Sequence, residues 1–352
     1  MSRYIRFDCA GLRMTSSSRT WAVLILVSGL SLGTVHSQTG DTFPNYVPLL
    51  SQIKAKTPHI DPKKGYVVQQ LKPEVYMITE GAYESAFATT GKGVVLFDAP
   101  PSFAPHIIQA VAETTSEPIV ELVYSHLHVD HIGGAGLIQK QFPNLEILAE
   151  DGTADFLREM HDPHRPVPTR TFKEHYRLTL GSLTAEMTLG HWHTPEGDLL
   201  ISIPDKKVLI AIDAFSSGAT PFMGLDLTMN MHEYLKFYDQ LRAMDFDVIV
   251  PGHHSTPAGR DDLEIAQSYV IDVYNTITRI LAEDHQALKA SAVQRYGENS
   301  WAVASVLMNS EINQCADEIK GRWINRVEGV DIWASSHCHT ALVYAEWDVG
   351  TR

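Results

Sequence analysis

Positive charge is scarce in this chain of 352 residues, which has 28 Lys and Arg against 42 Asp and Glu and a formal net charge of −14 at pH 7. Proteins that bind phosphate backbones need clustered basic side chains, and the sequence shows no basic patch. This deficit disfavours nucleic acid as a partner or substrate. It favours neutral or cationic small molecules instead.

The sequence also has no apolar run long enough to span a membrane, and its most apolar stretch lies near the start. The apolar stretch Trp21–Leu32 is too short to span a membrane and follows four arginines. Val35 and Ser37 then provide small residues before a cleavage site at Gln38. This pattern predicts a signal peptide over residues 1–37 and a secreted or periplasmic protein without stable membrane insertion; an uncleaved anchor is the alternative. Removing four arginines and one aspartate (Asp8) with this segment changes the net charge from −14 to −17.

Cysteine is scarce as well, with three in the chain. Cys9 lies in the predicted signal peptide, which leaves Cys315 and Cys338. In an oxidising compartment this pair is expected to form a disulfide or to stay as buried thiols. The alternative is a metal site at Cys338, which His337 and His339 flank, but no partner ligands with zinc-ribbon spacing stand nearby.

Histidine, by contrast, is concentrated in one place. The sequence contains the cluster H-x-H-x-D-H, formed by His126, His128, Asp130 and His131 and followed by two glycines. A short apolar run precedes the cluster and a helix-like stretch follows it, which predicts a strand-to-helix loop. Imidazole and carboxylate groups are ligands that Zn²⁺ and Fe²⁺ accept. The cluster therefore predicts a metal site, and its two halves can face two adjacent metal positions.

Short apolar runs predict many strands, with helices interspersed. The expected strands are Val75–Thr79, Ala86–Thr90, Gly93–Phe97, Ile119–Tyr124, Leu145–Ala149, Tyr176–Leu180, Ala185–Leu189, Leu199–Ile203, Val208–Ile212 and Val248–Val250. The expected helices are 103–114, Asp151–Met160 and Met231–Met244, followed by a long amphipathic helix after about residue 260. This order predicts an α/β (α+β) fold in which two mixed sheets pack together with helices outside.

The domain organisation follows from composition and from the order of these elements. Residues 38–65 are polar and interrupted by prolines, which predicts an extended arm, and His161–His175 is expected to be a loop. We assign residues 66–260 to the main domain and residues 261–352 to a C-terminal helical extension.

Further candidate ligands stand where predicted strands end. His193 precedes a turn that reads Thr-Pro-Glu-Gly-Asp, Asp213 follows an apolar run, and His253 follows Pro-Gly after another. His191 competes with His193 for the ligand role, and His254 competes with His253. The residues alone leave both pairs open.

From about Val75 to Ser255 the chain resembles the metallo-β-lactamase superfamily of αββα hydrolases. The resemblance rests on H-x-H-x-D-H, H-T-P, the strand-terminal Asp213 and P-G-H in this order, with Asp98 as a supporting aspartate ahead of the main motif. It implies two Zn²⁺ per chain, with iron or manganese as alternatives. The implied ligands of the first metal are His126, His128 and His193; those of the second are Asp130, His131 and His253, with Asp213 bridging the two.

The resemblance also implies a reaction. A hydroxide shared by two divalent ions can attack a carbonyl group, with Asp130 orienting the nucleophile or moving its proton. We therefore expect a zinc-dependent hydrolase acting on a small lactam, lactone or ester. The alternatives are a thioesterase of the same fold and an iron-dependent thiol or persulfide oxidoreductase.

Several departures from the family pattern limit the substrate prediction. Glu196 stands where the family often has glycine, and Ser216 stands where quorum-signal lactonases have tyrosine. The stretch after Asp213 is either an apolar wall for the substrate or ordinary core packing. Its apolar members are Phe215, Phe222, Met223, Leu225, Met229 and Met231.

Overall fold

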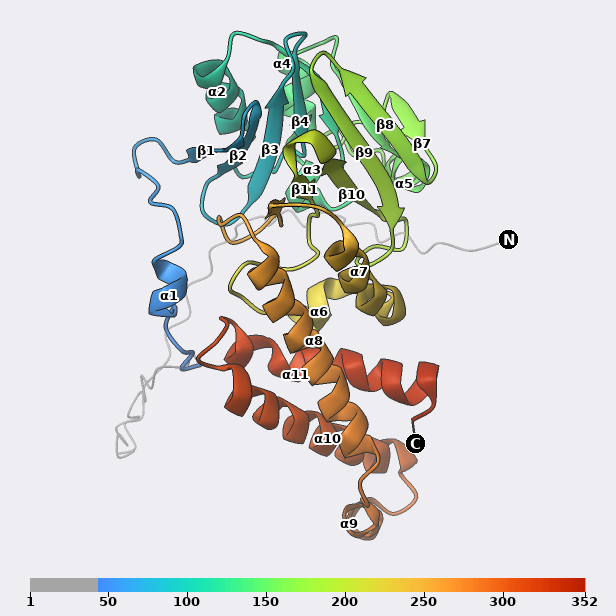
Figure 1. The fold of residues 1–352 in the computed structure, drawn as a ribbon. Coiled ribbons are helices and arrows are strands. Elements are labelled where there is room, and N and C mark those ends of the chain that lie inside the picture. The colour runs from blue at the N-terminus through green and yellow to red at the C-terminus, as the bar shows by residue number, and fades with distance from the viewer. Residues whose placement is uncertain (1–43, 352) are drawn as a thin grey trace, which may run out of the picture. The chain divides into compact units, whose positions relative to one another are not determined.

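The computed structural model describes residues 44–351, and its strands show how the sequence builds layers (Figure 1). In β2 (Val75–Thr79), Val75 and Met77 belong to the core between two sheets, whereas Ile78 belongs to the core on the other face. β4 (Val94–Phe97) is buried on both faces in the same way. Because successive strand residues face opposite sides, a strand covered on both faces is apolar throughout.

Within the described residues, two mixed sheets contain seven and five strands. In the first sheet the strands follow one another in chain order, with antiparallel pairing up to β4 and parallel pairing after it. The second sheet has the order β12-β11-β10-β9-β8, with only the β11–β12 pair parallel. The remaining bounds are β1 Val67–Lys72, β3 Glu84–Thr89, β5 Ile119–Val123, β6 Glu146–Glu150, β7 Arg170–Phe172, β8 His175–Leu180, β9 Leu183–Gly190, β10 Asp198–Ile203, β11 Val208–Ile210 and β12 Val248–Val250.

Helices cover the outer faces of both sheets, which confirms the predicted fold class. The core on the outer side of the first sheet includes residues of α2 (Ala104–Thr114), α3 (Val129–Ile132), α4 (Ala135–Gln141) and α5 (Asp151–Met160). The core on the outer side of the second sheet includes residues of α6 (Met223–Leu227), α7 (Met231–Ala243) and α8 (Arg260–Leu281).

The C-terminal helices share this second outer core. It continues from Leu209 and Ile249 in the sheet, through α7 and α8, to Ile319 and Leu342. The helices after α8 are α9 (Gln286–Tyr296), α10 (Ser300–Trp323) and α11 (Val330–Val343), with a π-helical turn at Tyr344–Val349. None of the helices among residues 44–351 is long and apolar enough to cross a membrane.

A disulfide joins α10 to α11 through Cys315 and Cys338. The pairing agrees with the disulfide interpretation of the sequence and leaves Cys338 unavailable as a metal ligand. The predicted signal peptide at 1–37 lies outside the described residues, as does the start of the predicted arm. The described part of the arm contains the short helix α1 (Ser51–Lys54).

Two strands were not predicted, and both lie at the edges of the first sheet. β1 has the polar sequence Val-Val-Gln-Gln-Leu-Lys and no fully buried residue. β7 has three residues within the segment that we expected to be a loop. An edge strand has a neighbouring strand on one side only and is more exposed to solvent. Neither β1 nor β7 therefore has the continuous apolar run that is typical of the central strands.

Candidate metal centre

The loop after β5 positions the histidine cluster. β5 ends at Val123, the loop contains His126 and His128, and α3 then contains Asp130 and His131. The glycines that follow allow this turn to pack tightly. A Cβ at Gly134 would lie 2.7 Å from the Ala99 carbonyl oxygen and 2.5 Å from the Ala104 Cβ, so a side chain would push the cluster away from the loop after β4.

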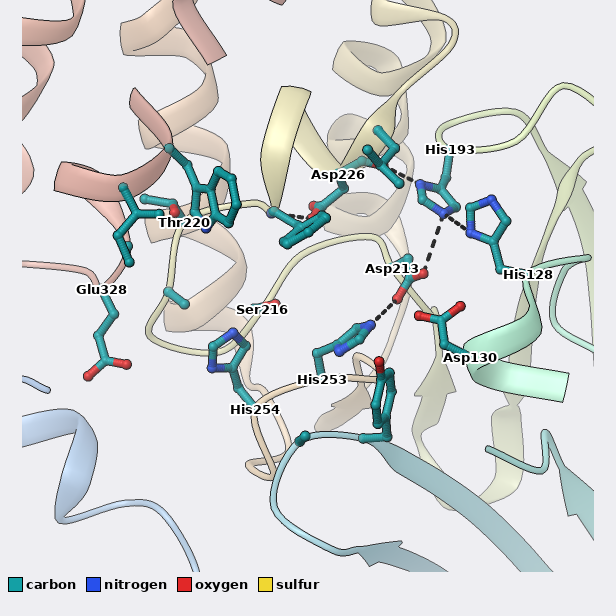
Figure 2. Close-up of a pocket in the computed structure, with 18 of the residues that line it drawn as sticks. His128, Asp130, His193, Asp213, Ser216, Thr220, Asp226, His253, His254 and Glu328 are labelled. Carbon is teal, nitrogen blue, oxygen red and sulfur yellow. Dashed lines mark hydrogen bonds and ion pairs between the residues drawn. The ribbon is translucent and has the colours of Figure 1, made fainter. Parts of the chain in front are cut away.

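Asp213 lies between two sets of imidazoles (Figure 2). Its Oδ2 is 3.4 Å from Nε2 of both His126 and His193, and its Oδ1 is 3.1 Å from Nε2 of both His131 and His253. Asp213 follows β11 and has a φ of 56°, a left-handed conformation that is unusual for a residue other than glycine. Such local strain is typical of functional sites.

The structure brings all seven predicted ligands into two adjoining groups. In each group the potential ligand atoms all lie within 4.8 Å of one another. Two nitrogen pairs are closer still: His193 Nε2 is 2.8 Å from His128 Nδ1, and His131 Nε2 is 3.2 Å from His253 Nε2. The first group is His126, His128, His193 and Asp213, and the second is Asp130, His131 and His253.

The donor set fits divalent cations. His126 Nε2 is buried and makes no hydrogen bond within the described residues, although it faces Asp213. A buried nitrogen without a partner is costly unless something else uses its lone pair. Imidazole nitrogens and carboxylate oxygens converging at this spacing are suited to zinc and to similar ions.

The electrostatics of the first group agree with ligand roles. Burial lowers the pKa of His126 well below its ordinary value and that of His128 to about 4, so both imidazoles are neutral at pH 7. Burial acts to raise the pKa of Asp213, but the charge of His131 and the imidazoles close to the carboxylate hold this pKa well below its usual range. The first group therefore contains an ionised carboxylate and two neutral imidazoles, which suits a cation.

His193 is oriented by a segment that sequence analysis did not identify. Its Nδ1–H donates to the carbonyl oxygen of Asp226, which leaves Nε2 directed at the centre. Residues 224–227 all have positive φ, between 55° and 63°. The Asp226 side chain stabilises this turn, because Oδ1 accepts a hydrogen bond from Phe222 N at 2.6 Å and Oδ2 accepts one from Tyr234 Oη–H at 3.2 Å. Nothing in the residue types predicts a left-handed turn here.

A buried carboxyl group also supports each ligand loop from behind. Asp98 Oδ1 accepts a hydrogen bond from Ser125 N, one residue before His126, which is the supporting position that the resemblance implied. Asp198 accepts from the backbone N–H of His193, and Glu84 accepts from Gly252 N next to His253. Burial raises the pKa of all three groups: to about 6 for Asp98, to about 6 for Asp198 and to about 8 for Glu84.

The competing histidines lie elsewhere. His191 is exposed and belongs to neither group, and His254 is exposed, although it borders the cavity described below. His161 and His164 in the Pro-rich loop, and His175 at the start of β8, are also exposed and belong to neither group.

A cavity of about 740 Å³ opens onto the two groups. Tyr83, in the turn between β2 and β3, contributes to its wall, and its ring centroid is 4.8 Å from that of His253 and 5.8 Å from that of His131. Ser216 also lines the cavity. The opposite wall comes from Glu328, Gly329, Ile332 and Trp333, at the start of α11 and just before it. A volume of this size accommodates a small organic molecule.

Comparisons with known proteins agree with the fold. Residues 79–253 match the family model described as the metallo-beta-lactamase superfamily. A metallo-beta-lactamase from Pontibacter korlensis superposes with a TM-score of 0.50 at 18% identity, over 58% of this chain and 97% of that one. The metallo-beta-lactamase IND-7 gives 0.49 at 20% identity, over 58% and 96%. A search of curated proteins finds no match. The matched segment ends at His253, before α8 begins.

Proposed function

Through residues 79–253 the chain belongs to the metallo-beta-lactamase superfamily, and from this premise we propose that it is a metal-dependent hydrolase of a small lactam, lactone or ester. The observation that carries the proposal is the position of Asp213, with one carboxylate oxygen toward each imidazole group. A carboxylate in that position suits a centre for two cations. The proposed occupant is zinc.

The residues of the first group would hold one cation and those of the second group the other. Asp213 would contribute to both, because its Oδ1 faces His131 and His253. Bound divalent cations supply Lewis acidity, which polarises a carbonyl group and makes water nucleophilic near neutral pH. The protein fixes the geometry through its supporting hydrogen bonds, such as that from His193 to Asp226.

Asp130 is the proposed proton carrier. Its side chain is partly exposed in the cavity, and its Oδ2 lies 3.7 Å from His131 Nε2. From this position the carboxylate can accept a proton from the attacking water and pass it to the leaving group. Tyr83 borders the same space, where its phenol O–H can donate a hydrogen bond to the carbonyl oxygen as negative charge develops.

We also propose that the protein is secreted or periplasmic. The disulfide between Cys315 and Cys338 supports this location, because such bonds persist in oxidising compartments. Mass spectrometry of the mature protein recovered from outside the cytoplasm tests it. A mature N-terminus at Gln38 is expected, and an intact chain retained in the cytoplasm would contradict it.

Hydrolysis assays test the function directly. Lactams, lactones, thioesters and aryl esters should be offered to the purified protein with zinc, and elemental analysis should accompany the assays. We expect turnover of at least one lactam, lactone or ester, its loss on chelation and its recovery with added zinc. Absence of hydrolysis, together with one iron per chain and oxygen uptake in the presence of a persulfide, would replace this proposal with the oxidoreductase alternative.

A further inference from the structure

The cavity has an aromatic corner that includes a residue from beyond the family match. The rings of Phe222 and Trp333 meet edge to face, with their centroids 4.8 Å apart. Both line the cavity, as do Leu227 and Ile332. We call Phe222, Leu227, Ile332 and Trp333 the aromatic chamber. Two of the four belong to α11, so the C-terminal helices form part of the reaction cavity.

The chamber presents apolar surface that protein atoms do not cover. Phe222 is 52% exposed, and Leu227 and Ile332 are each 39% exposed, although all three border a cavity. Large apolar side chains left open within a concave site are typical of a surface that binds a ligand.

Hydrogen bonds hold the Phe222 side of the aromatic chamber in place without a ligand. His337 Nε2–H donates to the Phe222 carbonyl oxygen at 2.9 Å, and Ser336 Oγ accepts a hydrogen bond from Gly224 N at 3.1 Å. On the other side, the carboxyl group of Asp226 accepts from Phe222 N. α11 therefore fixes the segment that contains Phe222, and a rigid apolar wall binds with less loss of conformational entropy.

The charge of the lining excludes one class of ligand. None of the described residues that line the cavity is Lys or Arg, while four contribute carboxyl groups: Asp130, Asp213, Asp226 and Glu328. Figure 2 shows Glu328 on the side of the cavity away from the candidate ligands His128, His193 and His253. The neutral polar groups include Thr220, whose buried Oγ1 makes no hydrogen bond within the described residues. An anionic substituent near the chamber would find no cationic side chain.

We propose that the aromatic chamber binds an apolar, aromatic part of the substrate and selects against a negative charge on that part. The inference rests on the proposed function in one respect: it places the bond to be cleaved at the His–Asp centre. Its contribution is the substrate class, namely uncharged or cationic aromatic esters, lactones or lactams. Trp333 and Ile332 are the specificity residues.

Two fluorescent probes with the same aromatic skeleton test the inference without any need for turnover. N-phenyl-1-naphthylamine is neutral, and 8-anilino-1-naphthalenesulfonate carries one negative charge on the same ring system. Their dissociation constants should be measured by fluorescence titration of the zinc-loaded protein. We expect the neutral probe to bind at least tenfold more tightly than the sulfonate.

Variants assign the binding to the chamber. Trp333→Ala should weaken binding of the neutral probe by about tenfold, because the edge-to-face wall is lost. Ile332→Ala should weaken it by about threefold, since it removes a smaller and more exposed apolar side chain. The matched control is Trp301→Ala, because Trp301 is 86% exposed on α10 and does not line the cavity. Circular dichroism confirms that each variant is folded.

The outcomes separate this inference from the proposed function. Equal or tighter binding of the sulfonate, or unchanged binding of the neutral probe by folded Trp333→Ala and Ile332→Ala, would overturn the chamber even if esters are hydrolysed. Preferential binding of the neutral probe that depends on Trp333 supports the chamber even if no substrate is turned over, in which case the hydrolase proposal alone fails.

Discussion

The two packed sheets with their ligand loops, here called the sandwich, and the C-terminal helices line different sides of one cavity. The segment that matches the family provides all seven candidate ligands at the ends of strands and in the loop after β5. The helices beyond it provide Ile332 and Trp333 on the other wall. The two regions nevertheless share one apolar core. On the two proposals above, the reaction depends on the family segment alone, whereas substrate selection also depends on Ile332 and Trp333 of the C-terminal helices. Single variants should therefore affect one property without the other.

Asp130→Asn, in the sandwich, should show the largest difference between its effect on turnover and its effect on probe binding. The amide cannot accept a proton from water, so turnover should fall by about 10³-fold, which lies within the usual range for the loss of a general acid–base group. Binding of the neutral naphthylamine probe should stay unchanged, since the chamber is intact. Steady-state kinetics and fluorescence titration measure the two effects. Asp155→Asn, at an exposed position of α5, is the control, and full turnover by Asp130→Asn would disprove the assigned role.

Removal of the disulfide should affect the other region. The double variant Cys315→Ala and Cys338→Ala frees a loop of 23 residues between α10 and α11. We expect the free energy of unfolding to fall by about 3 kcal/mol, the typical effect for a loop of this size. Denaturant unfolding with and without the bond measures the change. Zinc content of the folded variant should stay as in the wild type; loss of zinc without unfolding would mean that the two regions are not separable.

The C-terminal helices should also make the free energy of unfolding depend on pH, through His337. His337 is fully buried, and burial lowers its pKa from 6.5 to about 4. Between these values the unfolded chain binds a proton that the folded chain excludes, so stability is present above pH 6.5 and is lost as the pH falls toward 4. At pH 4.5 the loss should be roughly 2.5 kcal/mol.

His337→Gln is the variant that isolates this contribution, because an amide N–H can still donate to the Phe222 carbonyl oxygen. Its stability should depend less steeply on pH between 6.5 and 4.5 than that of the wild type. His339→Gln, at an exposed position on the same helix, is the matched control. Identical pH profiles for His337→Gln and the wild type would refute the assignment.

The smallest effect is expected for a change at Tyr83, which lines the cavity that both regions share. Tyr83→Phe removes one hydrogen-bond donor and keeps the ring beside His253. We expect kcat to fall roughly tenfold, in keeping with the loss of one hydrogen bond to a charged group, while KM stays nearly constant. A rise in KM alone would show that Tyr83 belongs to the binding surface and not to the reaction.

The sequence was most informative where strands are buried on both faces and where ligand types are rare. Continuous apolar runs predicted β2, β4 and β5 closely, and ligand chemistry together with the family pattern indicated Asp213 and the histidines. Two edge strands were not predicted, because exposure removes the apolar pattern. Asp226 was not identified either, since its role depends on a backbone carbonyl oxygen in a left-handed turn.

The chamber illustrates a second limit. The sequence left open whether the apolar residues after Asp213 form a wall or part of the core, and the structure divides them. Phe215, Leu225 and Met231 are buried, whereas Phe222 faces the cavity. This division depends on contacts with α11, more than 100 residues away in the chain. The spacing of apolar residues within one segment cannot predict contacts with residues so far away in the sequence.

On the proposed function, Asp213 joins the two groups into one centre for two cations. Calorimetric titration of the chelator-treated protein with zinc, alongside the Asp213→Ala variant, tests it most directly. The wild type should bind about two zinc ions per chain with proton release. Burial lowers the pKa of His131, but the negative charge of Asp213 and of other nearby carboxylates outweighs it and raises the pKa to about 9, so a proton must leave when zinc binds. Asp213→Ala should lose high-affinity binding at both positions. Undiminished binding of two zinc ions by the variant, or none by the wild type, would contradict the account.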